Sequence, residues 1–184
     1  RGAIKGALIV APKGVYKNWD QIEFPTHMPE HIEYTKVLWE PNITKRKQAE
    51  LDTLFEDNHK LKILIMNVEA FSTSKGLDFA HSFLNIFVGR ALFGIDESTT
   101  IKNPTAKRTK NILKIGDLAK YRRILTGSPV TKSPLDLFSQ CEFLDPHHLG
   151  HASYYSFRAR YANMVKRNFG GRSVQLVVSY RRLD

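Results

Sequence analysis

Short apolar segments that alternate with longer amphipathic ones restrict the fold of this chain more than any other feature. Three of these segments, Gly6–Ala11, Leu61–Met66 and Ala91–Ile95, are nearly continuous apolar runs, which is typical of strands buried on both faces of a sheet. The stretches between them carry helical periodicity and are too long for hairpin turns. Because strands joined through helices form crossover connections, we predict a three-layer α/β fold with a mainly parallel sheet.

The remaining elements are predicted from the same periodicity and from turn residues. Further strands are expected at 34–39, 122–126 and 173–180. Helices are expected at 15–24, 44–58, 76–88 and 104–120, from Ser133 onwards, and at 154–169. Proline disrupts helices, so Pro25 should end the first one, and Gly170-Gly171 should end the last. With no internal repeat or long linker, residues 1–184 should form a single domain whose tail, 150–184, is less regular.

Composition and charge limit the class of protein. The 184 residues, 42% of them apolar, are enough for one globular domain with a real core. A formal net charge of +10 favours a polyanionic partner, most often nucleic acid, although charge that serves only solubility is the simpler explanation. The single cysteine, Cys141, rules out an internal disulfide and favours a reducing compartment, the cytoplasm or a nucleoid. No apolar run approaches the ~18 residues of a membrane span, so no membrane partner is expected.

Two adjacent carboxylates end the strand predicted at Ala91–Ile95. Asp96 and Glu97 follow it directly, and ligands of parallel α/β sheets gather at the carboxyl ends of the strands. Carboxylates suit Mg²⁺, which keeps several waters and bridges to substrate phosphates. One carboxylate can hold the water shell of the metal while its neighbour activates a water molecule. The alternative is an ordinary acidic turn in solvent.

Loops at three strand ends have chemistry that fits a phosphate-bearing ligand. They are residues 11–14, 96–99 and 125–129, and in a parallel sheet all three emerge at one edge. In the third loop, Thr126 and Ser128 offer short hydroxyl groups, and Gly127 allows close approach to the backbone. A Thr-Gly-Ser-Pro turn by itself is weak support, because most such turns are plain turns. The order and spacing of the three loops together are more specific.

Four segments resemble the motifs of the Swi/Snf-type, helicase-like ATPases of superfamily two. Residues 11–19 resemble motif Ia, residues 67–71 motif Ib, residues 96–104 motif II, which is the Walker B element, and residues 125–129 motif III. With the helix after motif III, the resemblance extends from Ala7 to Arg182. It implies the first RecA-like lobe, of the P-loop NTPase type, of an ATP-driven translocase that acts on double-stranded nucleic acid, by resemblance DNA.

The resemblance also implies roles for individual residues. ATP and Mg²⁺ would be the cofactors, with Asp96 holding the water shell of the metal and Glu97 activating the attacking water. Thr126, Gly127 and Ser128 would couple the nucleotide to the nucleic-acid surface. Nucleic-acid contacts would come from six positions in motifs Ia, Ib and II: Pro12, Lys13, Gly14, Asn67, Lys102 and Asn103. Tracking a phosphate backbone needs cations and N–H donors rather than side chains that read bases.

The sequence also departs from the family pattern. Motif II usually ends in Ala-His, but Ser98-Thr99 stands here, so the histidine that normally reaches motif III is missing. Lys132 stands where the family often has asparagine.

No G-x-x-x-x-G-K-[ST] phosphate loop occurs, and the chain opens without methionine, so we expect a piece of a longer protein. Because the second lobe with its arginine fingers is also missing, this chain alone should hydrolyse ATP no faster than background. Loss of the phosphate-loop strand from the sheet interior should expose two hydrogen-bonding edges.

Two basic regions leave alternatives open. Residues 101–124 contain eight lysines and arginines against one acid, and Lys107, Lys110 and Lys114 share a helical face that either contacts phosphates or is merely solvated. Residues 154–172 interleave five aromatic residues with five basic ones, and the aromatic residues either stack on unpaired bases or belong to the core. The rival function is a non-catalytic nucleic-acid clamp derived from a helicase lobe. A metal-dependent nuclease would need more carboxylates than this sheet edge supplies.

Overall fold

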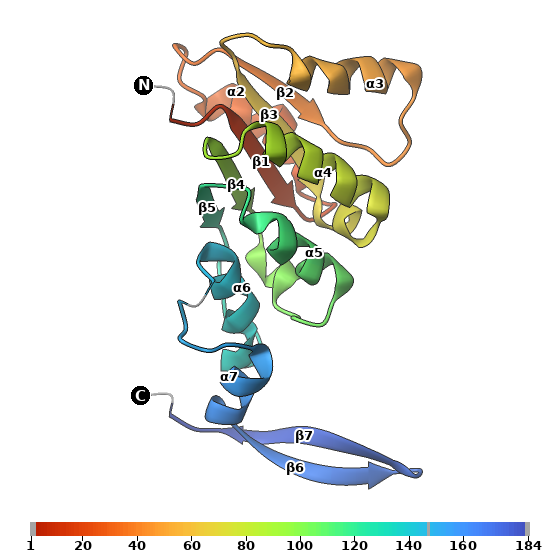
Figure 1. The fold of residues 1–184 in the computed structure, drawn as a ribbon, viewed down its shortest axis with the longest axis vertical. Helices are drawn as coiled ribbons and strands as arrows, with labels where there is room; N and C mark the ends of the chain where they lie inside the picture. The colour runs from red at the N-terminus through yellow and green to blue at the C-terminus, as the bar shows by residue number, and fades with distance from the viewer. Residues whose placement is uncertain (1–2, 147, 183–184) are drawn as a thin grey trace.

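A five-stranded parallel sheet forms the centre of the structure. The computed structural model describes residues 3–146 and 148–182. The strands lie in the order β2-β3-β1-β4-β5, and every neighbouring pair is parallel (Figure 1). Their bounds are β1 Gly6–Ala11, β2 Tyr34–Leu38, β3 Leu61–Asn67, β4 Ala91–Ile95 and β5 Tyr121–Ile124. The predicted mainly parallel α/β architecture is confirmed.

The five strands are adjacent without a gap. β1 pairs directly with β3 on one side and with β4 on the other, so the expected pair of exposed edges inside the sheet is absent from the described strands. Within this part of the chain, the open edges are the outer sides of β2 and β5. Each unpaired edge presents backbone N–H and C=O groups to solvent or to a neighbour.

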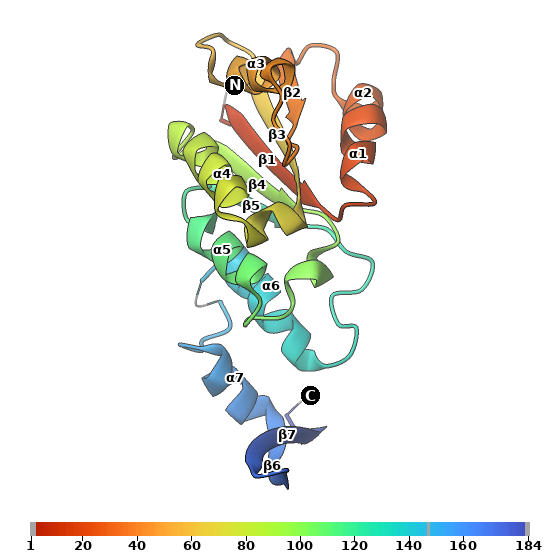
Figure 2. The same cartoon turned by 90° about the vertical axis from the view of Figure 1, so that its right-hand side faces the viewer.

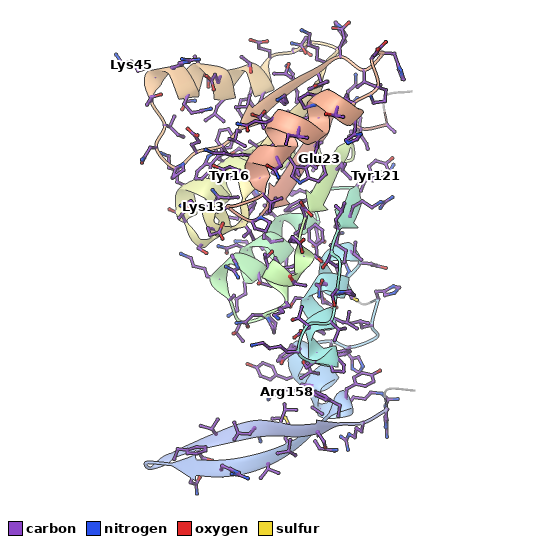
Figure 3. The ribbon with its side chains drawn as sticks, turned by 180° about the vertical axis from the view of Figure 1, so that it is seen from behind. Lys13, Tyr16, Glu23, Lys45, Tyr121 and Arg158 are labelled. Carbon is purple, nitrogen blue, oxygen red and sulfur yellow. The ribbon has the colours of Figure 1, made fainter. Side chains whose placement is uncertain are left out.

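Helices cover both faces of the sheet and produce the three layers (Figure 2). One face is covered by α3 Lys45–Asp52, the 3₁₀ turn η2 Thr53–Phe55, α4 Ser74–Ile86 and α5 Lys107–Gly116. The other face is covered by α1 Tyr16–Asn18, the π-helical turn η1 Trp19–Glu23 and α2 Phe24–His27, which Figure 3 shows from behind. The remaining elements of this part are η3 Val68–Ser72, η4 Ser98–Ile101, η5 Pro134–Asp136 and α6 Leu137–Leu144.

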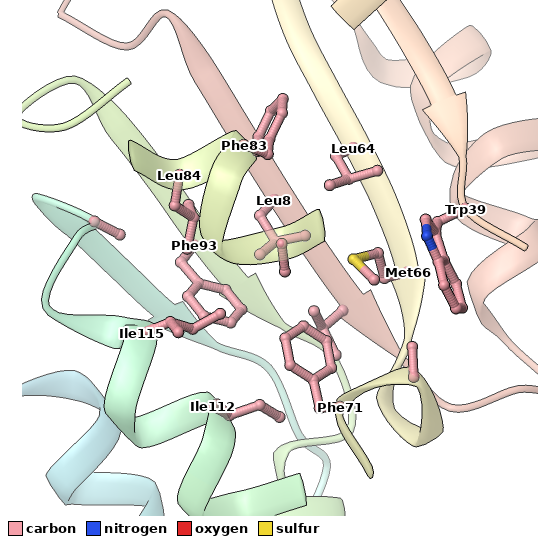
Figure 4. Packing of buried hydrophobic residues seen from close by; sticks show 14 of the residues in the cluster. Leu8, Trp39, Leu64, Met66, Phe71, Phe83, Leu84, Phe93, Ile112 and Ile115 are labelled. Atoms are coloured by element: carbon pink, nitrogen blue, oxygen red, sulfur yellow. The ribbon is translucent and has the colours of Figure 1, made fainter. Parts of the chain in front are cut away.

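Alternation along the central strands divides the core into two layers. Leu8 and Val10 of β1 face α4 and α5, whereas Ile9 packs beneath α1 and η1 on the other face. In the larger layer, Phe93 of β4 is fully buried near Phe71 (Figure 4). Its ring lies 6.3 Å from that of Phe71 and 4.9 Å from that of Phe143, between centroids. Each fully buried side chain of this size stabilises the fold by about 1.5–3 kcal/mol, so this layer holds the helices on the sheet.

A close backbone contact orients α4 and requires glycine. Thr73 caps the helix, with its hydroxyl accepting a hydrogen bond from the Gly76 N–H at 3.1 Å. A Cβ at Gly76 would lie 2.4 Å from the carbonyl oxygen of Ala70 in η3. The start of α4 therefore packs on the segment after β3 at a distance that only glycine permits.

The helical segment after β1 continues through Pro25, which the sequence predicts to be its end. The π turn η1 makes this possible, because the Phe24 N–H donates to the Trp19 carbonyl, five residues back. Pro25 is the second residue of α2, and the helical segment runs through it without a break. The predicted boundary at Phe24 is therefore wrong, and the helical segment ends at His27.

Two other helices are shorter than predicted. Thr44 caps α3 as expected, by accepting from the Lys47 N–H at 3.2 Å, but the helical segment ends with η2 at Phe55 rather than at 58. α5 ends at Gly116 rather than at 120, where two short turns lead into β5. Both differences lie at helix ends, where local sequence signals are weakest.

The tail after residue 150 contains regular structure of its own. α7, Tyr154–Tyr161, leads directly into β6, Ala162–Phe169, so the single helix predicted at 154–169 is wrong. β6 pairs antiparallel with β7, Arg172–Tyr180, which confirms the last predicted strand but gives it a partner outside the central sheet. The turn between them is Gly170-Gly171, both at positive φ. Two glycines between apolar stretches are a hairpin signal that the helical interpretation overlooked.

Candidate functional site

The loops that carry the motifs meet at one edge of the sheet. The Asp96 N–H donates to the Val10 carbonyl at 2.7 Å, and the Leu125 N–H donates to the Ile95 carbonyl at 2.8 Å. Ala11 at the end of β1 lies in register with Asn67 at the end of β3. The strand ends before motifs Ia, Ib, II and III are therefore neighbours, and the predicted common edge is confirmed.

The carboxylate of Asp96 is held by two donors. Its Oδ2 accepts from the indole Nε1–H of Trp19 at 2.8 Å, and its Oδ1 accepts from the backbone N–H of Glu97 at 2.9 Å. In the sequence, Trp19 is the last residue of the segment that resembles motif Ia, and no role was predicted for its side chain. Its indole N–H could have indicated a hydrogen bond, because a partly buried indole usually finds an acceptor. Motif Ia therefore fixes the orientation of the first carboxylate of motif II.

Glu97 adopts a strained backbone conformation. Its φ of 48° and ψ of 58° lie in the left-handed region, which costs a residue other than glycine about 1–3 kcal/mol. Its side chain is exposed, and within residues 3–146 and 148–182 its carboxylate has no hydrogen-bond or ion-pair partner. Strain of this kind persists where the surroundings enforce it, and it is found most often at functional sites.

The carboxylate oxygens at this edge fit a metal ion that is held mainly by water and phosphate. Each oxygen of Asp96 uses one lone pair for its protein donor and keeps another for a metal-bound water. No group of three histidine, cysteine, aspartate or glutamate side chains that could enclose a metal occurs among the described residues. Mg²⁺ is bound in this manner, by one or two carboxylates plus waters and substrate phosphates.

Ser98 links motif II to the segment after motif III. Its fully buried hydroxyl donates to Gln140 Oε1 at 2.6 Å, and its N–H donates to the Leu125 carbonyl at 3.0 Å. The amide of Gln140 in turn donates to the carbonyls of Pro129 and Asp136, at 2.7 and 2.8 Å. The sequence shows that the usual histidine is missing, and the structure shows a different connection between the same two motifs.

A second link joins motif II to this segment through Asp136. The Asp136 carboxylate accepts from the N–H and hydroxyl of Thr131 and from the Lys132 N–H, at 2.9 to 3.1 Å, and Lys102 Nζ lies 3.6 Å away and bonds Thr131. Burial acts to raise the pKa of Asp136, but these hydrogen bonds and the Lys102 charge outweigh it and lower that pKa. Lys132 contributes through its backbone, so the asparagine it replaces is not needed for this contact.

The motif III turn is built from its own hydroxyl groups. Thr126 Oγ1 accepts from the Ser128 N–H at 3.2 Å, and Ser128 Oγ donates to the Val130 carbonyl at 2.9 Å. Gly127 and Ser128 are exposed, and a Cβ at Gly127 would meet nothing within 4 Å. The turn is ordered beside Asp96 and open on its outer side.

The residues predicted to contact nucleic acid differ in their freedom to do so. Lys13 and Gly14 are exposed after β1, where the Pro12 carbonyl accepts from the N–H groups that start α1. Asn67 is buried, and its Oδ1 caps η3 by accepting from the Ala70 N–H at 2.9 Å. Two further positions also carry internal contacts: Lys102 bonds Thr131, and Asn103 accepts from Thr105.

The two basic regions, 101–124 and 154–172, differ in how their side chains are placed. Lys107, Lys110 and Lys114 are all exposed along α5, as their spacing predicts. Three of the aromatic residues in the tail, Tyr154, Phe157 and Tyr161, pack in a small cluster beneath α6. Phe169 is 57% exposed and Tyr155 is 64% exposed, so these two do not belong to that core.

Comparison with known proteins supports the family resemblance that the sequence motifs indicate. The sequence profile of the SNF2-related domain family matches residues 1–177. The Sulfolobus solfataricus SWI2/SNF2 ATPase core, solved in complex with dsDNA, has a TM-score of 0.61 and 25% identity, over 86% of this chain and 28% of that one. Protein CHROMATIN REMODELING 20 of Arabidopsis thaliana is 25% identical over 168 residues, 89% of this chain and 11% of that protein. DNA annealing helicase and endonuclease ZRANB3 of Bos taurus is 38% identical over 79 residues, 43% of this chain and 7% of that protein.

The fold and the edge that carries the four motifs define a RecA-like α/β lobe. With residues 1–177 matched, the chain belongs to the SNF2-related domain family, which confirms the resemblance drawn from the motifs. It spans 7 to 11% of the length of the two curated relatives named above. Within the described residues, no helix has both the length and the apolarity needed to cross a bilayer.

Proposed function

We propose that this chain is the first nucleotide-binding lobe of an ATP-dependent DNA translocase, and that it supplies the Walker B and coupling motifs. The observation that carries the proposal is the pairing of the strand ends at this edge of the sheet. The Asp96 N–H bonds the Val10 carbonyl, and the Ile95 carbonyl, just before Asp96, accepts from the Leu125 N–H. Further support comes from the relatives reported above, one of which is a DNA annealing helicase. Such a protein acts where its DNA is, in the cytoplasm or on a nucleoid.

Asp96 and Glu97 divide the chemistry between them. Bound Mg-ATP supplies the triphosphate and the metal-bound waters. Asp96, oriented by Trp19, would hold the metal through those waters and so position the nucleotide. Glu97, which is exposed beside Asp96, accepts the proton of the attacking water.

The motif III segment transmits the state of the nucleotide to the nucleic-acid surface. Thr126, Gly127 and Ser128 follow the strand beside Asp96, so a change at the metal reaches this turn first. The hydrogen bonds from Ser98 to Gln140 and from Lys102 to Thr131 then tie motif II to α6 and the loop before it. In this chain these two links replace the contact of the missing histidine.

The DNA backbone runs along the loops of motifs Ia, Ib and II. Lys13 and Gly14 contribute an exposed cation and an exposed backbone next to Pro12. Asn67 acts through the backbone of η3, which its side chain caps, and Lys102 and Asn103 continue the surface beyond motif II. Contacts of this type position DNA without reading its sequence. The duplex that accompanies the Sulfolobus structure supports double-stranded DNA as the partner.

ATP hydrolysis in this family also needs a phosphate-binding loop and a second lobe, which the 184 residues do not contain. No phosphate-binding loop occurs in the sequence, and an arginine finger from a second lobe typically contributes about 10³–10⁵ in rate in related phosphoryl-transfer enzymes. The 184-residue chain alone should therefore show only background turnover, and the full-length protein should be active. DNA-stimulated hydrolysis by the isolated chain would contradict this part of the proposal.

The decisive measurement is the ATPase rate of the full-length protein with and without duplex DNA, beside a Glu97→Gln variant. We expect duplex DNA to stimulate the wild type, and the variant to lose about 10²-fold or more in kcat because a general base is removed. Binding of ATP and of DNA should persist in the variant. Unchanged turnover would remove Glu97 from its role, and DNA binding without turnover in the wild type would favour the non-catalytic clamp.

A further inference from the structure

The hairpin formed by β6 and β7 extends away from the rest of the molecule. Figures 1 and 2 show it at the end opposite β2, crossing beyond α7 on the side where α4 and α5 lie. Its base is held firmly: the Arg181 guanidinium donates to the carbonyls of Ala159 and Arg160 at the end of α7, at 2.6 and 3.1 Å, and the Arg181 N–H donates to Tyr161. Met164 and Val177 pack at this base against the small cluster beneath α6.

The outer half of the hairpin, residues 165–176, has no packing partner in the described chain. Val165 and Leu176 are 43% and 38% exposed, Val174 is 42% exposed, and none of them belongs to a core cluster. A two-stranded hairpin without a covered face is only marginally stable in water. An exposed apolar face on an anchored hairpin therefore indicates a partner.

The charge of this region selects the kind of partner. Between Asp145 and Asp184 the sequence contains seven lysines and arginines and no acidic residue. On the hairpin, Lys166 and Arg167 are exposed and have no ion-pair partner among the described residues. Cross-strand register places Arg167 opposite Val174, between the apolar pair Val165–Leu176 and the tip, so one cation interrupts the apolar face, and Lys166 lies on the opposite face beside Gln175. Such a surface matches a polyanion that also presents apolar planes, namely nucleic acid.

The tip supplies an aromatic plane at a narrow point. Phe169 directly precedes the Gly170-Gly171 turn, and a Cβ at either glycine would meet nothing within 4 Å. The Phe169 side chain is 57% exposed and contacts no other aromatic ring of the described chain. A tip of this size can approach a base stack closely, and an exposed phenyl ring stacks on bases of any sequence.

We propose that the β6–β7 hairpin is a second nucleic-acid site, which binds the junction between duplex and unpaired DNA with Phe169 stacked on an exposed base. The inference rests on the proposed function, because it assumes that the same protein holds duplex DNA along motifs Ia to II. Arg167 contacts a phosphate from the apolar face, Lys166 contacts one from the opposite face, and the apolar side chains cover the sugar and base edges. The substrate class is therefore forked or frayed duplex rather than continuous duplex.

The test compares binding of two DNA probes to the full-length protein by fluorescence anisotropy. One probe is a blunt duplex, and the other is a fork that carries the same duplex with two unpaired arms. We expect Phe169→Ala to weaken binding of the fork about five-fold or more and to leave binding of the blunt duplex unchanged. Phe169→Tyr should restore binding of the fork. Ile86→Ala is the matched control, because Ile86 is 56% exposed on α4 and should affect neither probe.

The basic residues give an independent readout. A Lys166→Gln, Arg167→Gln double variant should bind the fork more weakly. The slope of log K for fork binding against log salt concentration should become shallower by about 1.8 at most, since each phosphate contact contributes about 0.9. Fork binding that is equal in wild type and Phe169→Ala would overturn the proposal, as would a loss shared by Ile86→Ala. Duplex-stimulated ATPase is measured on the same samples, so failure of the hairpin site is distinguishable from failure of the proposed function.

Discussion

Replacement of Trp19 by phenylalanine tests the contact on which the orientation of the motif II carboxylate depends. The substitution keeps an aromatic ring in the layer beneath η1 but removes the Nε1–H that donates to Asp96 Oδ2 at 2.8 Å. Among the residues that the structure describes, Asp96 then keeps one donor, the Glu97 N–H on its other oxygen. We expect the carboxylate to sample orientations that no longer hold the metal-bound waters in place.

The size of the effect follows from the kind of hydrogen bond that is lost. Hydrogen bonds to charged groups contribute about 1.5–3 kcal/mol. Asp96 is only half-buried, so water compensates in part, and the lower end of that range applies. A loss of about 1.5 kcal/mol from the transition state lowers the rate about tenfold. We therefore expect kcat of the DNA-stimulated ATPase of the full-length protein to fall about tenfold in Trp19→Phe.

Trp39 provides a matched control within the same chain. It is 1% exposed, and its Nε1 has no hydrogen-bond partner in the part of the chain that the structure describes. Trp39→Phe therefore removes the same atoms without removing a hydrogen bond, and the small cavity it leaves is offset by the loss of an unsatisfied donor. We expect its kcat to stay within about twofold of wild type. A normal kcat in Trp19→Phe, or an equal loss in both variants, would refute the reasoning.

Three further predictions concern two links around the site and the packing of α4. Ser98→Ala leaves Gln140 Oε1 buried without a donor, so chemical denaturation should show a loss of about 1–3 kcal/mol, and unchanged stability would mean that the 2.6 Å contact contributes nothing. Asp136 has a lowered pKa in the folded state, so its ionised form stabilises the fold above its unfolded pKa of about 3.9, and this contribution disappears as the pH falls through the lower folded pKa. Melting temperatures of wild type and Asp136→Asn should accordingly differ at neutral pH and converge below about pH 4, and a constant difference would disprove the assignment. Gly76→Ala places a Cβ 2.4 Å from the Ala70 carbonyl and should destabilise the protein by about 1–3 kcal/mol in thermal unfolding, whereas an unchanged melting temperature would show that α4 can move.

Local patterns in the sequence were sufficient for the central sheet. The apolar runs at 6–11, 61–66 and 91–95 became β1, β3 and β4 with almost unchanged bounds, because a strand buried on both faces needs a continuous apolar run. Parallel pairing then followed from the helical stretches between them, and parallel pairing placed the motif loops at one edge. The candidate residues Asp96, Glu97 and Thr126 were therefore accessible from the sequence alone.

Contacts between distant residues were not accessible in the same way. Trp19 and Asp96 are 77 residues apart, and Ser98 and Gln140 are 42 apart, so no local pattern indicates that they bond. The π turn before Pro25 likewise departs from the regular helical spacing that sequence patterns detect. In the tail, aromatic residues at helical spacing favoured a helix, but β6 instead found its hydrogen bonds in β7.

By itself, the sequence determined the layered parallel sheet, the family motifs and the identity of the two carboxylates, since apolar periodicity and short motifs are properties of neighbouring residues. Only the tertiary structure decided how Asp96 is oriented, how motif II is connected to motif III without a histidine, and that the basic tail ends in a hairpin with Phe169 at its tip. The physical reason is that hydrogen-bond donors and strand edges are satisfied by whichever partner the completed fold brings within reach.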